Sequence, residues 1–142
     1  MAEQEWWTSP LEDDNGNLIM VTGRGDVEKF YRKKNFSIRF EVTISYQADE
    51  TGMPVRSEAI MLDDALTLLQ AELDKDPVVV LTGVYTGGGE RNMILYGGST
   101  NIFTKIINRA LASLPLLPLK IEAFNDPEWE EYDEMREISE IQ

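Results

Sequence analysis

Residues 78–98 read VVVLTGVYTGGGERNMILYGG, and the rest of the fold can be placed around this stretch. Two apolar runs flank three consecutive glycines, a pattern typical of two β-strands joined by a turn. The glycines also resemble a phosphate-binding loop in composition, because bare backbone amides can surround an anion. A phosphate-binding loop runs into a helix, however, whereas these glycines run into a second strand. We therefore predict a β-hairpin in which the glycines serve the turn.

Strand and helix patterns lie on both sides of this hairpin. Residues 36–47 alternate strictly between apolar and polar side chains, which predicts a strand with one buried face and one wet face. Residues 119–124 alternate in the same way and predict a last strand. Apolar residues at three- and four-residue spacing predict a helix on each side of the hairpin. Their start and stop signals are Asp63 and Pro77 for the first helix, and Ser99 or Thr100 and Pro115 for the second.

From residue 36 onward the predicted order is strand, helix, strand, strand, helix, strand. This order is typical of an α+β, ferredoxin-like split βαβ sandwich, with an antiparallel sheet and two helices on one face. Residues 4–23 contain an Asn-Gly pair and predict an N-terminal β-hairpin extension. The chain is thus expected to be a single domain, 1–142. Its parts are a hairpin and basic segment (1–35), a βαββαβ core (36–125) and an acidic C-terminal tail (126–142).

Three features of this predicted fold depend on what packs against them: one face of the sheet, one strand edge and a pair of tryptophans. The polar face of the sheet stays open unless the N-terminal segment or the tail crosses it. The strand at residues 36–47 offers an edge that can pair across a dimer if nothing covers it, so a monomer or a homodimer is expected. Trp6 and Trp7 are neighbours in a strand and should point to opposite faces. We interpret both as core or edge packing, with the lining of a cleft as the alternative.

Composition excludes several classes of function. The chain has 142 residues, 26 acidic and 13 basic, for a net charge of −13, which disfavours nucleic-acid binding. Without histidine or cysteine it lacks the commonest general base and metal ligands, and no catalytic, cofactor or metal site is predicted. No run is long and apolar enough to span a membrane, and the N-terminus lacks the pattern of a signal peptide, so a cytoplasmic location is expected. The basic segment at 24–35 and the tail acids are interpreted as solvated surface.

One group of polar and aromatic residues is the candidate site. If the last strand lies beside the hairpin, a cation, a carboxylate and several rings converge at one end of the sheet, which suits a small polar ligand. The same groups also suit a structural latch in which Arg91 pairs with Asp126 and the rings cap the core, and this is the preferred interpretation. The candidate residues are Thr86, Arg91, Tyr96, Asp126, Trp129 and Tyr132.

These motifs resemble a family of bacterial proteins called domain of unknown function six-nine-five. The resemblance is carried by three motifs that span nearly the whole chain. They are Glu5-Trp6-Trp7, Gly83-x-x-Thr86-x-x-Gly89-x-Arg91 followed by Tyr96, and Asp126-Pro127-x-Trp129-x-x-Tyr132. The family has no established activity, so the resemblance implies a domain type and a bacterial, cytoplasmic origin, without a reaction.

Two hypotheses of function follow. The first, which we prefer, is a non-enzymatic binding or regulatory module whose acidic surface engages a protein partner with a basic surface. The second is a small-molecule-binding domain or an enzyme for a small polar or anionic ligand. In that case Arg91 would anchor the ligand, and Asp126 or Tyr132 would serve in acid–base roles.

Overall fold

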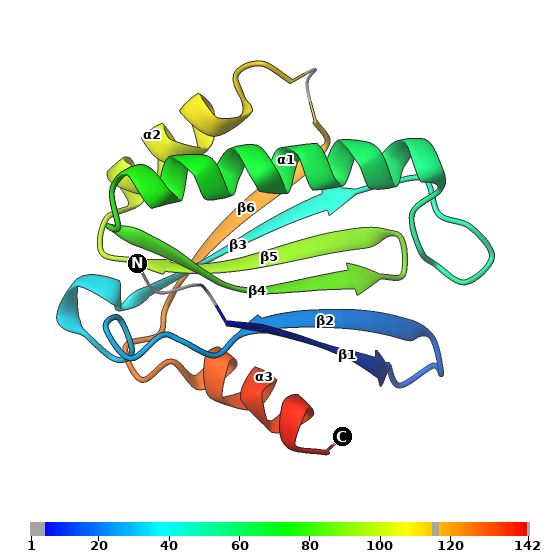
Figure 1. The fold of residues 1–142 in the computed structure, drawn as a ribbon, viewed down its shortest axis with the longest axis horizontal. Coiled ribbons are helices and arrows are strands. Elements are labelled where there is room, and N and C mark those ends of the chain that lie inside the picture. Colours follow the sequence, from blue (N-terminus) through cyan, green and yellow to red (C-terminus); the bar gives the residue numbers. More distant parts are fainter. Residues whose placement is uncertain (1–4, 115–116, 142) are drawn as a thin grey trace.

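The computed structural model describes residues 5–114 and 117–141, which form a six-stranded antiparallel sheet and three helices (Figure 1). The α+β class and the antiparallel sheet are therefore confirmed. The strands lie in the order β1-β2-β4-β5-β3-β6. The elements are β1 (Trp6–Glu12), β2 (Leu18–Arg24), a 3₁₀ turn (Lys34–Phe36), β3 (Ile38–Ser45), α1 (Arg56–Lys75), β4 (Val79–Gly87), β5 (Glu90–Gly97), α2 (Thr100–Leu111), β6 (Leu119–Asn125) and α3 (Glu130–Ile141).

The predicted central hairpin is β4–β5, at the middle of the sheet. Gly87 pairs with Glu90, and the two residues between them, Gly88 and Gly89, have φ angles of 60° and 85°. This left-handed region strains residues that carry a Cβ, so the turn requires glycine for its backbone. The predicted N-terminal hairpin is β1–β2, and β2 pairs with β4, so this hairpin extends the same sheet.

Helices α1 and α2 lie together on one face of the sheet and cover the larger hydrophobic core (Figure 1). The alternation in β3 sends Phe40, Val42 and Ile44 into this core, where the Phe40 ring stacks on Phe103 of α2 at 4.0 Å. As predicted, Ser99 caps α2, because its side chain accepts a hydrogen bond from the backbone of the first turn. The predicted start of α1 is wrong. The helix begins at Arg56, one and a half to two turns before Asp63, without a side-chain cap.

The acidic tail crosses the opposite face of the sheet as α3 and encloses a second hydrophobic core there (Figure 1). Met135 of α3 is fully buried against the backbone of β4, since a Cβ at Gly83 would lie 2.5 Å from its sulfur. A side chain at residue 83 would therefore force Met135 to shift. Trp6 packs against the core under α1, and Trp7 packs against the core under α3, which confirms that they point to opposite faces.

The edges of the sheet differ from the expected ones. The strand predicted at residues 36–47 is not an edge, because β3 pairs with β5 on one side and with β6 on the other. The edges are β1 and β6. Among the helices of the described ranges, none has the length and hydropathy needed to cross a bilayer.

Candidate functional site

Four of the six predicted site residues meet on the face of the sheet that α3 covers. The ring of Tyr96, on β5, stacks on that of Trp129, with centroids 4.1 Å apart and planes inclined by 15°. Tyr132 meets the same indole edge-on at 5.4 Å. The indole N–H donates to the carbonyl of Phe36 at 2.8 Å, and the Tyr132 hydroxyl donates to the carbonyl of Arg24 at 2.6 Å. All three rings are buried, so they fill the space between sheet and helix.

Asp126 joins this cluster as its central acceptor. Its carboxylate is 4% exposed and accepts hydrogen bonds from the Tyr96 hydroxyl at 2.7 Å and from an Arg39 guanidinium nitrogen at 2.9 Å. It also accepts from the backbone amides of Glu130 and Glu131, which begin α3, and so it caps that helix. Burial by itself would raise the pKa of Asp126, but these hydrogen bonds outweigh it and hold the pKa below its ordinary value.

We call this group of contacting side chains the latch and define it as Arg39, Tyr96, Asp126 and Trp129. Asp126 lies directly after β6, and Trp129 has a left-handed φ of 58° just before α3 begins, so the chain turns sharply between the two elements. The latch fixes that turn and sets α3 across the sheet. The guanidinium of Arg39 also pairs with Glu41 at 2.8 Å and lies over the Phe124 ring at 4.5 Å.

Thr86 and Arg91, the other two predicted residues, lie apart from the latch. They form a cross-strand pair near the turn of the central hairpin, and the guanidinium of Arg91 donates to the Thr86 hydroxyl at 3.0 Å and to Asp63 of α1 at 3.1 Å. The expected pairing of Arg91 with Asp126 is wrong. Arg91 and Tyr96 are five positions apart on one strand, an odd number, so their side chains point to opposite faces of the sheet. Arg39 supplies the cation instead, and sequence reasoning missed it.

A second carboxyl group is buried beside the latch. Glu131, on α3, accepts a hydrogen bond from the Tyr85 hydroxyl at 2.8 Å, while its other oxygen is buried without a hydrogen-bond partner. Burial raises the pKa of Glu131 to about 7, and the nearby carboxylates of Glu41 and Asp126 add to this effect against the opposing influence of Tyr85 and Arg39. Burial likewise raises the pKa of Tyr85 above its ordinary value. This pair can bind and release a proton near neutral pH.

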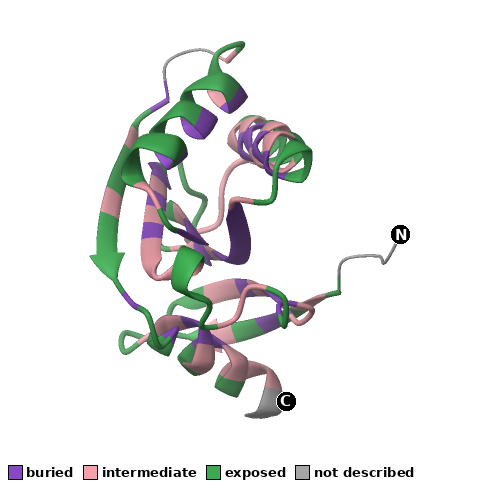
Figure 2. Cartoon of the chain, turned by 90° about the vertical axis from the view of Figure 1, so that its left-hand side faces the viewer, coloured by how far each residue is buried: buried purple, intermediate pink, exposed green. Residues whose placement is uncertain are grey.

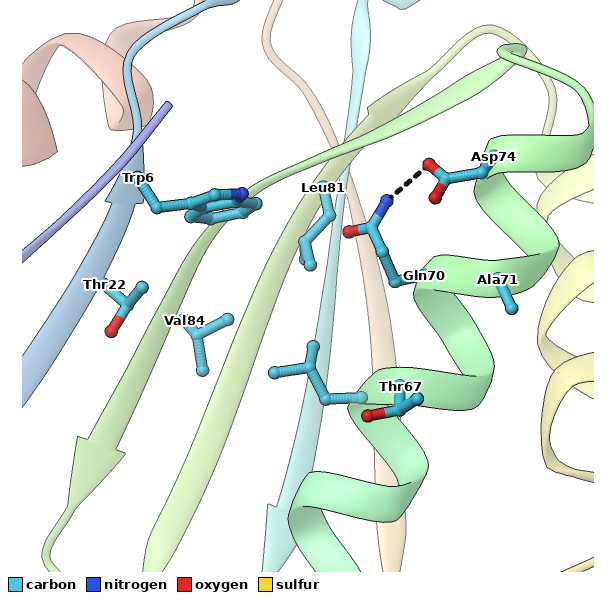
Figure 3. A pocket seen from close by; sticks show the side chains of 9 residues that line it. Trp6, Thr22, Thr67, Gln70, Ala71, Asp74, Leu81 and Val84 are labelled. Carbon is cyan, nitrogen blue, oxygen red and sulfur yellow. Dashed lines mark hydrogen bonds between the residues drawn. The ribbon is translucent and has the colours of Figure 1, made fainter. Parts of the chain in front are cut away.

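An open cleft lies on the other face of the sheet, between α1 and the N-terminal hairpin (Figure 3). Helices α1 and α2 cover the sheet from β4 to β6, which leaves the same face of β1 and β2 without a helix above it (Figure 1). The cleft measures about 470 Å³, which is within the range of small-molecule sites. Its walls are built by Trp6 and Thr22 from the hairpin, Leu81 and Val84 from β4, and Leu66, Thr67, Gln70, Ala71 and Asp74 from α1.

The lining of this cleft is mostly apolar and carries a single charge. The indole of Trp6 reaches from β1 toward α1 over the side chains of Leu81 and Val84 (Figure 3). On the far side, the Gln70 amide donates to the carboxylate of Asp74 at 2.8 Å, and Asp74 is the only charged residue among the described residues that line the cleft. An aromatic face opposite a carboxylate suits a flat ligand that carries a positive charge. The sequence offered one signal for this site: the lining of a cleft was the alternative interpretation of Trp6 and Trp7, and Trp6 lines this cleft.

Within the described ranges, no group of three or more acidic side chains is arranged to hold a metal ion.

Comparison with known proteins places the chain in a family. It belongs to the family of unknown function DUF695, whose model matches residues 5–135, as the sequence motifs predicted. No curated protein and no solved structure matches the chain.

Proposed function

We propose that this chain is a non-enzymatic binding module, with a ferredoxin-like core, that holds a small ligand in the cleft between α1 and the N-terminal hairpin. The strand order β4-β5-β3-β6, with α1 and α2 on one face, supports the ferredoxin-like description. The observation that carries the proposed function is the cleft itself, an apolar space with an aromatic wall and one carboxylate.

The chemistry of the lining defines the class of ligand. The Trp6 indole provides a flat apolar surface for stacking, and Leu81 and Val84 form an apolar floor. Asp74 attracts a positive charge, and none of the lining residues within 5–114 and 117–141 is a cation that could hold an anion. The ligand is therefore a flat, largely apolar molecule that carries an amino group. The alternative of an anion held by Arg91 has less support, because Arg91 is tied to Asp63 and Thr86 away from the cleft.

Three probes of the same shape test this assignment. Tryptamine, indole and indole-3-acetate share one ring system and differ in charge, so saturation-transfer NMR can rank them on the intact protein. Tryptamine should bind most strongly and indole-3-acetate least, because Asp74 attracts the first and repels the second. Equal signals for all three probes, or the strongest signal from the acid, would contradict the proposal.

Variants of α1 locate the binding. Thr67 is exposed on the helix and lines the cleft, so Thr67→Phe should fill the space and abolish tryptamine binding without disturbing the core. Asp74→Asn should weaken the binding of tryptamine about tenfold and leave the binding of indole unchanged. Asp64→Asn is the matched control, because Asp64 is an exposed acid of the same helix outside the cleft. If the Asp64 and Asp74 variants weaken tryptamine binding equally, the binding depends only on the net charge of the protein.

A second function, engagement of a basic protein partner, is proposed for the acidic surface. Glu130, Glu134 and Glu137 recur at four- and three-residue spacing on α3 and are all exposed, so they form one outward acidic row. The row can steer and dock a partner with a basic surface, which suits a regulatory module. Asp133, beside this row, is already paired with Arg32 at 3.0 Å.

A matched pair of triple variants tests this second function. The first neutralises the row on α3 with Glu130→Gln, Glu134→Gln and Glu137→Gln. The control neutralises three exposed acids elsewhere with Asp14→Asn, Glu50→Gln and Glu90→Gln. A partner recovered by the wild type at low salt should be lost with the first variant and kept with the control. Loss with both variants would mean that net charge, and not this row, is responsible.

A further inference from the structure

Strand β6 is an open edge of the sheet. It pairs with β3 on one side, and no strand of the described ranges pairs with its other side. Its seven residues contain no proline, whereas β1, the other edge, carries Pro10. In Figure 2, β6 is the strand that descends from the upper grey segment, and it is coloured mostly as exposed. An unprotected edge presents backbone groups that another strand can bind.

Exposed apolar side chains lie on and beside this edge. Ile121, at the middle of β6, is 43% exposed. A groove of about 500 Å³ runs beside it, lined by Ile107 and Leu111 of α2 and by Leu119 and Ile121 of β6 among others. Exposed apolar surface next to an open strand edge is typical of an interface between protein chains.

The hydrogen-bond pattern between β3 and β6 shows which backbone groups face outward. Asp126 donates its amide to the carbonyl of Ser37, and Ser45 donates its amide to the carbonyl of Pro118. In an antiparallel pair the bonded positions alternate along the strand, so Lys120, Glu122 and Phe124 also direct their backbone groups toward β3. The backbone groups of Ile121 and Ala123 and the carbonyl of Leu119 therefore point away from the sheet.

We propose that β6 pairs with β6 of a second copy of this chain, antiparallel and centred on Ile121, to form one continuous twelve-stranded sheet. In this register the Ile121 amides and carbonyls of the two copies bond to each other, and the amide of Ala123 bonds to the carbonyl of Leu119 of the second copy. The exposed Ile121 side chains meet at the two-fold axis, beside the two grooves. The contact is isologous, so it closes as a dimer.

The charges on β6 select this register. With Ile121 at the centre, Lys120 of each copy stands opposite Glu122 of the other, in a position where cross-strand side chains are closest. Both side chains lie on the face of the sheet opposite Ile121, and their own contact within the chain is long, at 3.5 Å, and largely exposed. A shift of the centre to Glu122 would place two carboxylates opposite each other, which is unfavourable. The binding cleft lies at the far side of the sheet and stays open in the dimer.

Charge exchange tests the register directly. Lys120→Glu and Glu122→Lys each place like charges opposite one another in the dimer, so each variant alone should dimerise about tenfold more weakly than the wild type. A mixture of the two variants restores both opposite-charge pairs and should form a heterodimer at least as tight as the wild-type dimer. Sedimentation equilibrium at about 0.15 M salt, where the repulsion between two chains of charge −13 is screened, provides the measurement.

The amide exchange of β6 provides a second readout. The amides of Ile121 and Ala123 should become protected from hydrogen exchange as the protein concentration rises, while that of Glu122 is protected throughout by β3. Ile121→Pro removes an outward amide without removing a bond to β3, and it should also yield a monomer. A wild type that stays monomeric at about 1 mM overturns the proposal. So does a dimer that both charge variants leave unchanged.

Discussion

The buried carboxyl of Glu131 makes a sharp prediction about pH and stability. In the folded state the pKa of Glu131 is about 7, against an ordinary value of 4.5. The groups that face it are Tyr85 from β4, Glu41 and Arg39 from β3, and Asp126. The perturbation is Glu131→Gln, which keeps an oxygen for the Tyr85 hydroxyl and removes the ionisable proton.

The sign of the effect follows from linkage. The raised pKa means that the folded state holds a proton which the unfolded state has released, so the unfolding free energy falls as the pH rises from about 4.5 to 7. Below that window both states are protonated, and above it both are ionised. At about 1.4 kcal/mol for each tenfold change, the difference between the two pKa values corresponds to a loss of about 3 kcal/mol.

Chemical denaturation at a series of pH values measures this loss. The stability of Glu131→Gln relative to the wild type should rise by about 3 kcal/mol between pH 4.5 and 8. Glu134→Gln is the control, because it removes one acid from the exposed side of the same helix and should shift the whole profile without changing its shape. If the unfolding free energies of the Glu131 and Glu134 variants show the same pH dependence, the carboxyl of Glu131 is not desolvated as described.

Three further predictions concern the latch and the cores. Asp126→Asn should lower the unfolding free energy by about 2–4 kcal/mol, because it leaves the charge of Arg39 without its buried partner. That cost should shrink as the pH falls below 3.8, because the unfolded wild type then binds a proton on Asp126 while the folded state, whose pKa is lower, still keeps the carboxylate ionised. Met135→Ala should cost about 2–5 kcal/mol by leaving a cavity, detectable as a lower denaturation midpoint. Arg91→Ala should cost only about 1 kcal/mol in the same assay, because its partner Asp63 is 72% exposed; a cost equal to that of the latch variant would contradict this.

The fold could be predicted from the sequence wherever one physical signal dominated. Alternation of side chains identified β3, and glycine identified the turn between β4 and β5, because both signals act within a few residues. The start of α1 at Arg56 was missed since no side chain caps it; its first turn is tied instead to Gln47, which donates its amide to the Glu58 carboxylate at 3.0 Å. The edge position of β6 depends on strand order, which is a long-range property.

The site was predicted only in part, for a related reason. Tyr96, Asp126 and Trp129 were grouped correctly because their residue types suit one cluster, and the structure brings them together. Arg91 was grouped with them by type alone, although strand parity places it on the other face. Arg39 was overlooked because its role depends on register: β3 lies between β5 and β6, and this places Arg39 directly across from Tyr96.

The central hairpin also contained a signal for the second core. Strand β3 alternates and so has one apolar face, but β5 reads Met93-Ile94-Leu95-Tyr96 without alternation, and all four side chains are buried. A strand that is apolar on both faces must be covered on both faces. Helices α1 and α2 cover one face, so a further element has to cover the other, and only the N-terminal segment or the tail can reach it. Helix α3 meets this requirement: it packs against β1 and β4, Ile94 and Tyr96 of β5 join its core, and it leaves the polar face of β6 open.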